Sequence, residues 1–281
     1  MKRSAGVLMP ISSLPSKYGI GTLGKGARDF IDFLEKSGQT SWQVLPIGPK
    51  GYGDSPYQSF SSNAGNPYFI DLDDLCDEGY LEKEEYVNEN YGTDVNCVDY
   101  AQIYNTRFTV LRKAVERLSA VQTEDYLSFL RDNAYWLNDY ALFMAEKDDH
   151  KGQAYTIWEE DIRKHDTKTL ENERVRLQKN VEFYLGLQYF FFHQWKKMRE
   201  YGRKHGVYLI GDVPIYVSPD SSDIWGNPEL FQLDEDMKPT GVAGCPPDAF
   251  SADGQLWGNP LYNWDKMKDY DYTWWVNRVR Y

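Results

Sequence analysis

Short apolar runs and a helical stripe alternate along the first fifty residues. "AGVLMPI" (5–11) predicts a buried strand, and "SWQVLPIGP" (41–49) predicts a second one. The segment between them has apolar residues at helical spacing, namely Ala27, Phe30, Ile31 and Leu34. Gly38 follows this stripe and predicts the end of a helix. The order strand, helix, strand indicates a βαβ unit of a parallel sheet.

The pattern becomes helical and charged over residues 77–180 and then returns to the sheet type. No Gly/Ser/Pro-rich linker bounds this stretch, so we interpret it as a helical insertion within one domain that spans 1–281. A helical stripe then precedes "VYLIGDVPIYV" (207–217), which predicts a third buried strand. The closing "DYTWWVNRVRY" predicts an amphipathic helix. Three parallel strands cannot close a barrel, and an open sheet of three would leave a bare face.

Composition narrows the class of partner. A net charge of −12 argues against nucleic acids and anionic membrane surfaces, because both attract a basic face. Aromatic residues make up 16% of the chain, and several lie in Gly/Pro loops, where they suit a surface that grips an amphipathic ligand. The three cysteines and four histidines show no metal-ligand spacing, so we expect no metal, no cofactor, reduced thiols and a cytoplasmic location. No segment is apolar enough to span a bilayer.

Three acidic residues follow the predicted strands. Asp54 lies after the second strand, Asp212 lies at the end of the third, and Asp248 lies in the loop "PPDAF". Ligand sites in parallel α/β folds form at the carboxyl ends of the strands, so we expect these acids on one rim. Any one of them alone could instead form an Asx turn or cap a helix.

Aromatic and amide side chains accompany these acids. The aromatic residues are Tyr57, Phe250 and Trp257, and the amides are Gln58, Asn66, Gln255 and Asn259. Sugar rings present apolar faces for stacking, and their hydroxyls need donors and acceptors in fixed directions. The combination therefore predicts a carbohydrate site. Phosphate-binding loops and a serine-hydrolase elbow do not occur in the sequence.

Five long stretches carry a family resemblance. They are "PISSLPSKYGIGTLG", "WQVLPIGPKGYGDSPYQSFSSNAGNPYFIDL", "WLNDYALFMAEK", "GDVPIYVSPDSSDIWGNPELF" and "GCPPDAFSADGQLWGNPLYNW". In these stretches, and in their order, the chain resembles the 4-α-glucanotransferases, the amylomaltase or disproportionating enzymes of α-glucan metabolism. The resemblance implies a (β/α)8 TIM barrel with helical insertions. It also implies a retaining double displacement on α-1,4-glucans and maltooligosaccharides, with glucose as an acceptor.

The resemblance also implies roles for single residues. Ser55 and Tyr57 would line donor subsites, and Asp212 would support the reacting sugar. Asp248, Phe250, Gln255 and Trp257 would belong to a mobile loop over the glucan. The full set of expected substrate-binding residues is Tyr52, Asp54, Ser55, Tyr57, Asp212, Asp248, Phe250, Gln255, Trp257 and Asn259.

One departure from the family is decisive. The family's nucleophile lies in an Arg-Ile/Leu-Asp-His motif, and that motif does not occur in residues 1–281. We therefore expect the chain to be the N-terminal half of the enzyme, with nucleophile and acid/base beyond Tyr281, and to be inactive alone. The alternatives are a related α-glucan hydrolase and a non-catalytic α-glucan-binding protein.

Overall fold

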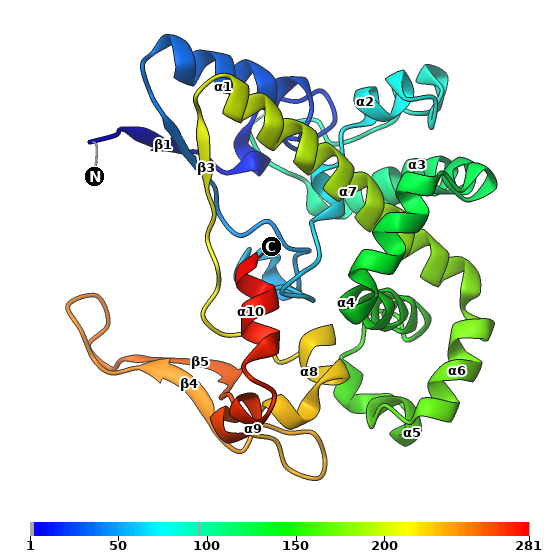
Figure 1. Ribbon diagram of the computed structural model, residues 1–281, viewed down its shortest axis with the longest axis vertical. Helices are drawn as coiled ribbons and strands as arrows, with labels where there is room; N and C mark the ends of the chain where they lie inside the picture. Colours follow the sequence, from blue (N-terminus) through cyan, green and yellow to red (C-terminus); the bar gives the residue numbers. More distant parts are fainter. Residues whose placement is uncertain (1–2, 95, 281) are drawn as a thin grey trace. The chain divides into compact units, whose positions relative to one another are not determined.

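The structure is a computed structural model that describes residues 3–94 and 96–280 (Figure 1). The chain divides into two compact units, each built from separate segments. Unit 1 comprises Met1–Pro49, Gly65–Ala134 and Glu182–Val213, and unit 2 comprises Lys50–Ala64, Tyr135–Val181 and Pro214–Tyr281. The predicted boundaries, one domain with an insertion over 77–180, stay a prediction.

The sheet of unit 1 has three parallel strands in the order β1-β2-β3, which are β1 (Gly6–Leu8), β2 (Ser41–Gln43) and β3 (Tyr208–Ile210). Helix α1 (Lys25–Lys36) connects β1 to β2, and Gly38 after it has a φ of 72°, as predicted for a helix end. The three predicted strands are confirmed, but each is shorter than its apolar run. Every run contains a proline, which has no N–H for the ladder: Pro10, Pro46 and Pro214.

The two faces of this sheet differ in burial. Trp42 points to one face, where it is fully buried and its ring lies 5.0 Å from that of Phe30 in α1. Leu8, Ile210 and Tyr208 point to the other face, and all three are exposed. The prediction of buried strands is therefore wrong for the face that carries these three residues, whereas the expectation of a bare face is confirmed.

One short helix and three long ones complete the set of α-helices described for unit 1 besides α1. They are α2 (Leu72–Asp77), α3 (Tyr100–Val121), and the parts of α4 (Glu124–Asp149) and α7 (Gln178–Lys204) that belong to this unit. Two buried glutamines of α7 hold the beginning of the second segment of unit 1, which starts at Gly65. Gln188 bonds both the N–H and the carbonyl of Gly65, and Gln194 does the same for Asp71. Because these hydrogen bonds of the glutamine amides are buried, breaking one would leave a donor or acceptor unsatisfied and would cost stability.

Gly65 has no room for a side chain. A Cβ added there would lie 1.9 Å from Cδ1 of Phe191, and the backbone cannot retreat because Gln188 holds it on both sides. We expect Gly65→Ala to lower the free energy of unfolding by about 3 kcal/mol. Gly211→Ala is the matched control, because nothing lies within 4 Å of its added Cβ, and its effect should stay below about 1 kcal/mol. Urea denaturation measures both, and equal losses would contradict the steric argument.

Unit 2 contains short elements around a core. Besides its parts of α4 and α7, unit 2 contains α5 (Glu160–Arg163), α6 (Thr167–Arg176), α8 (Ser222–Gly226), β4 (Val242–Cys245), β5 (Gln255–Pro260), α9 (Trp264–Asp269) and α10 (Thr273–Arg280). Helix α10 confirms the amphipathic helix predicted at the end of the chain. The antiparallel hairpin of β4 and β5 replaces what the sequence predicts as a loop.

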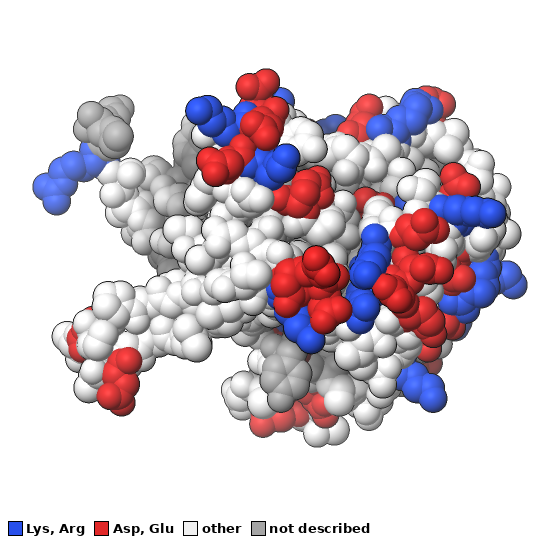
Figure 2. Space-filling model, turned by 90° about the horizontal axis from the view of Figure 1, so that it is seen from below, with Lys and Arg blue, Asp and Glu red and all other residues white. Residues whose placement is uncertain are grey.

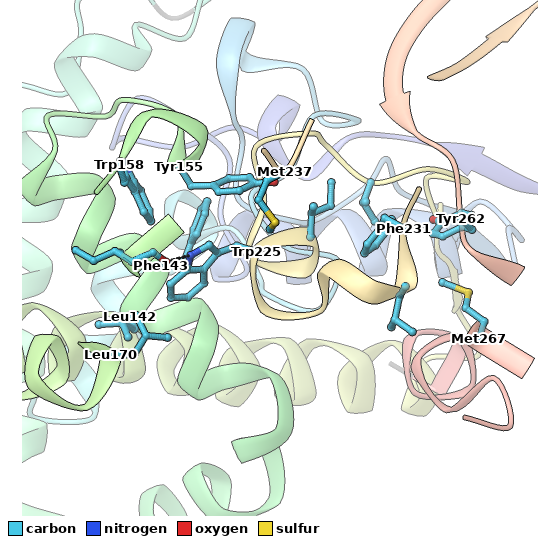
Figure 3. Packing of buried hydrophobic residues seen from close by; sticks show 14 residues of the cluster. Leu142, Phe143, Tyr155, Trp158, Leu170, Trp225, Phe231, Met237, Tyr262 and Met267 are labelled. Atoms are coloured by element: carbon cyan, nitrogen blue, oxygen red, sulfur yellow. Dashed lines mark hydrogen bonds between the residues drawn. The ribbon is translucent and has the colours of Figure 1, made fainter. Parts of the chain in front are cut away.

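Aromatic side chains form the core of unit 2 (Figure 3). Trp225 is 0% exposed, and its ring lies 5.7 Å from that of Phe143 and 6.1 Å from that of Trp158. The indole Nε1 of Trp225 donates to the carbonyl of Ile162 at 2.9 Å. Within the described residues, no helix is both long and apolar enough to cross a membrane.

Candidate functional site

The loop between β4 and β5 carries two of the predicted residues. Asp248 Oδ1 accepts hydrogen bonds from the backbone N–H groups of Phe250 and Ser251, both at 2.8 Å, so its carboxylate stabilises the turn. Phe250 is 97% exposed. In Figure 2 the acidic colour of the hairpin is confined to its free end, and residues 242–260 contain no Lys or Arg. The hairpin therefore offers mostly uncharged surface.

Strand β5 carries the next three predicted residues. Gln255 Oε1 accepts a hydrogen bond from the indole Nε1 of Trp257 at 3.0 Å, which limits rotation of the ring. Trp257 is 43% exposed, and its ring lies 6.3 Å from that of Tyr216. Asn259 is buried, and its Nδ2 donates to the carbonyl of Val217 at 2.6 Å. Trp257 thus keeps ring surface for a ligand, whereas Asn259 joins β5 to the segment before α8.

The loop that begins at Lys50 carries the remaining predicted residues of unit 2. The N–H of Gly51 donates to the carbonyl of Gln58 at 2.6 Å, which closes the loop at its base. Asp54 has a φ of 55°, and Ser55 Oγ accepts from the N–H of Tyr57 at 3.3 Å. The ring of Tyr57 is exposed. The side chain of Tyr52 lies outside the described atoms.

The other predicted residues belong to unit 2, except for the buried amide Asn66 of unit 1, and Asp212 also belongs to unit 1. It follows β3 by two residues and is half-buried. The single rim that the sequence predicts for Asp54, Asp212 and Asp248 therefore stays a prediction.

A titratable cluster that the sequence did not suggest lies on α4. Ligand atoms of Glu146, Asp149 and His150 all lie within 4.8 Å of one another. The guanidinium of Arg176 already occupies this cluster, with Nη2 2.9 Å from Asp149 Oδ2 and 3.7 Å from Glu146 Oε2. A metal ion could bind here only by displacing that cation.

Glu146 predicts a dependence of stability on pH. Its burial and the nearby Glu173 raise the pKa of Glu146 to about 7, above the value of about 4.3 for an unfolded glutamate. The folded state then holds the proton more tightly, so the free energy of unfolding falls as pH rises from about 4.5 to about 7, by on the order of 2 kcal/mol. Glu146→Gln should remove this contribution to the decrease in the free energy of unfolding with rising pH.

Urea midpoints at pH 5 and pH 8 test the pH dependence. The exposed Glu171 of α6 provides the control variant Glu171→Gln. From pH 5 to pH 8 its urea midpoint should decrease by as much as that of the wild type. A Glu146→Gln variant that loses as much stability as the wild type would contradict the role of this carboxyl.

Sequence reasoning missed a cavity of about 310 Å³ in unit 2, lined among others by Tyr135, Asp139, Asn227, Tyr270 and Asn277. The signal that could have found it is the run "YDYTWW", in which aromatic and polar residues crowd together beside an exposed turn. Trp136 also lines the cavity, within the stretch 77–180 that the sequence predicts only as a helical insertion.

Comparison with known proteins identifies the relatives of this chain. A family model described as 4-alpha-glucanotransferase matches residues 9–281. A 4-alpha-glucanotransferase of Clostridium butyricum is 47% identical over 97% of this chain, and that of Thermus thermophilus is 44% identical over 99%. The solved amylomaltase from Streptococcus agalactiae, in complex with acarbose, superposes with a TM-score of 0.94 at 44% identity over 99% of this chain.

The relatives are considerably longer than this chain. The chain spans 56% of the length of the Clostridium butyricum and Thermus thermophilus relatives, and 57% of the Streptococcus agalactiae chain. The match nevertheless extends over nearly all of the 281 residues, with an identity well above the level at which only a fold is shared. The chain therefore belongs to the 4-alpha-glucanotransferase family.

Proposed function

We propose that this chain works as part of a retaining 4-α-glucanotransferase of the cytoplasm, which transfers α-1,4-glucan segments between maltooligosaccharides. Family membership supports the reaction class, and the structural neighbour from Streptococcus agalactiae was solved with acarbose bound. The three cysteines of the chain are free thiols, which suits the cytoplasm. Glucose would serve as an acceptor.

The reaction proceeds in two displacements. A carboxylate forms a bond to the anomeric carbon as the glycosidic C–O bond breaks, and an acid carboxyl gives its proton to the leaving sugar. The 4-hydroxyl oxygen of a second sugar then attacks the same carbon as the bond between that carbon and the first carboxylate breaks, and the hydroxyl proton passes to the acid/base carboxylate, so no cofactor is needed. Both catalytic carboxyls are expected outside residues 1–281, because the Arg-Ile/Leu-Asp-His motif is absent here. This chain would supply substrate contacts, with Asp212 supporting the reacting sugar.

One observation carries the proposal, namely the aromatic surface left uncovered on the β4–β5 hairpin. Phe250 and Trp257 leave much of their ring area exposed on a segment without basic residues. Large exposed rings are costly in water unless a partner covers them, and sugar rings have the matching apolar faces. We infer that the hairpin covers a bound glucan and limits the access of water to the glycosyl-enzyme.

The bare face of the sheet supports a barrel that these three strands begin. Leu8, Ile210 and Tyr208 are exposed on it, and the outer strands β1 and β3 each pair on one side only within the described residues. Further parallel strands would pair with both edges and enclose that face, as in a (β/α)8 barrel. The alternative, a glucan-binding protein without turnover, is favoured by the missing nucleophile motif.

Trp257 provides a direct test of glucan binding. We expect Trp257→Ala to weaken binding of maltotriose by about tenfold, because a stacking surface is lost. Leu256→Ala is the matched control, since Leu256 is 80% exposed on the same strand and points to the opposite face. Isothermal titration calorimetry measures both affinities. Equal affinities in the wild type and in Trp257→Ala would refute the stacking role of the hairpin.

A further inference from the structure

The cavity of unit 2 is separate from the predicted glucan-binding residues. Its volume of about 310 Å³ is at the lower end of small-molecule pockets, which hold ~300–1,000 Å³. The lining comes from four stretches, namely 61–63, 135–139 of α4, 222–230 in and after α8, and 267–277 from α9 into α10. None of the described residues predicted for the glucan is among them. The lining of the cavity is therefore distinct from the set of residues predicted for the glucan.

Aromatic rings form much of the wall. Tyr135 and Tyr270 are 52% and 54% exposed, while Trp136 lies buried among the lining residues. The turn that presents Tyr270 is strained, because Asp271 and Tyr272 both have positive φ, 52° and 55°. Such backbone costs on the order of 1–3 kcal/mol per residue and is found preferentially where a structure positions groups for function.

Hydrogen bonds hold this turn in place. The N–H of Tyr272 donates to the carbonyl of Met267 at 2.8 Å, and Thr273 Oγ1 donates to the carbonyl of Tyr270 at 2.7 Å. Tyr270 is therefore presented from a fixed backbone. A fixed backbone lowers the conformational entropy that is lost when a flat ligand stacks on the exposed ring.

Polar groups of the wall accept hydrogen bonds. Arg174 donates to Oδ1 of Asp139 at 2.9 Å, and within the described residues no hydrogen bond involves Oδ2. The Nδ2 of Asn227 donates to the carbonyl of Asp223, which leaves the Oδ1 of that amide as an acceptor. Asn277 adds a second amide. Carboxylate and amide oxygens in this number suit a ligand that carries several hydroxyl donors.

The charge of the wall selects among hydroxylated ligands. Burial alone would raise the pKa of Asp139, but His165 and Arg174 together hold that pKa below its ordinary value. Asp139 is therefore ionised at neutral pH, and the exposed Glu229 adds a second carboxylate to the lining. Asp223 also lines the cavity, but its burial raises the pKa of its carboxyl, so the charge argument rests on Asp139 and Glu229. A phosphorylated or carboxylated sugar would be repelled, whereas a neutral sugar would not.

We propose that this cavity is a second saccharide-binding site, which takes one or two neutral sugar rings stacked on Tyr270 and hydrogen-bonded by Asp139, Asn227 and Asn277. The choice of an α-glucan as the probe rests on the proposed function, but the stacking and hydrogen-bonding argument does not. The site would hold a glucan apart from the hairpin residues and so raise its local concentration.

Hydrogen–deuterium exchange of the 281-residue chain with maltose locates the binding. We expect slower exchange over residues 267–277, and about tenfold weaker protection by maltose in Tyr270→Ala. Asn277→Ala provides a second variant if Tyr270→Ala does not fold, and it should weaken protection in the same segment. Tyr104→Ala, which removes another exposed tyrosine, and Tyr57→Ala should both leave this protection unchanged. Glucose 6-phosphate should protect the segment at least about tenfold more weakly than maltose.

The outcomes separate this proposal from the proposed function. Protection confined to residues 242–260 and lost in Trp257→Ala would overturn the second site and leave the hairpin assignment intact. Protection of 267–277 that persists in both folded variants would also overturn it. Protection of 267–277 alone would support the second site and count against the hairpin.

Discussion

Replacing Trp225 with alanine is expected to lower the free energy of unfolding by about 3–5 kcal/mol. The side chain is 0% exposed and packs against Phe143, Trp158 and His165. Its removal would leave a cavity among aromatic rings that are too rigid to collapse into it. It would also leave the carbonyl of Ile162 without the donor that it has now.

Trp257 is the matched control for this experiment. Both tryptophans begin the tetrapeptide Trp-Gly-Asn-Pro, but Trp257 is 43% exposed and its indole N–H bonds only a neighbouring glutamine. We expect Trp257→Ala to change the free energy of unfolding by less than about 1 kcal/mol. Urea denaturation followed by circular dichroism compares the two variants. Similar losses would show that the local sequence, and not the packing around each ring, determines the role of the tryptophan.

The spacing of apolar residues along the sequence predicted the first helix and the three strands of unit 1. The apolar positions of α1, with Ala27, Ile31 and Leu34 fully buried, agree with the structure, and so does the parallel order of the strands. Strand length could not be predicted from hydrophobicity, because prolines within the apolar runs end the hydrogen-bonded ladder. Hydrophobic runs also cannot reveal which face is covered, since that depends on segments distant in the sequence.

The candidate site was less predictable than the fold. The Gly/Pro-rich stretch around residue 250 has the composition of a loop, yet its ends pair as the hairpin of β4 and β5. Small and polar residues make up most of both strands, so the β-branched and aromatic residues that usually mark a strand are scarce. Asp248 forms the turn that the sequence left open as its alternative role, since its carboxylate accepts hydrogen bonds from the N–H groups of Phe250 and Ser251. The cavity beside Tyr270 was missed because its wall is assembled from four separate stretches of sequence, and no single motif marks it.

Turnover of maltotriose tests the central claim, that this chain supplies substrate contacts of a glucanotransferase but not its catalytic carboxyls. Glucose release should be undetectable with the 281-residue chain, because no nucleophile motif is available to form the glycosyl-enzyme. The chain joined to the part of the Clostridium butyricum relative that it does not cover should release glucose and make longer oligosaccharides. The same fusion with Asp212→Ala should be at least about a hundredfold slower.

The central claim predicts an inactive chain and an active fusion that makes glucose together with longer glucans. Turnover by the rigorously purified chain alone would contradict it, and so would a folded fusion that only hydrolyses maltotriose.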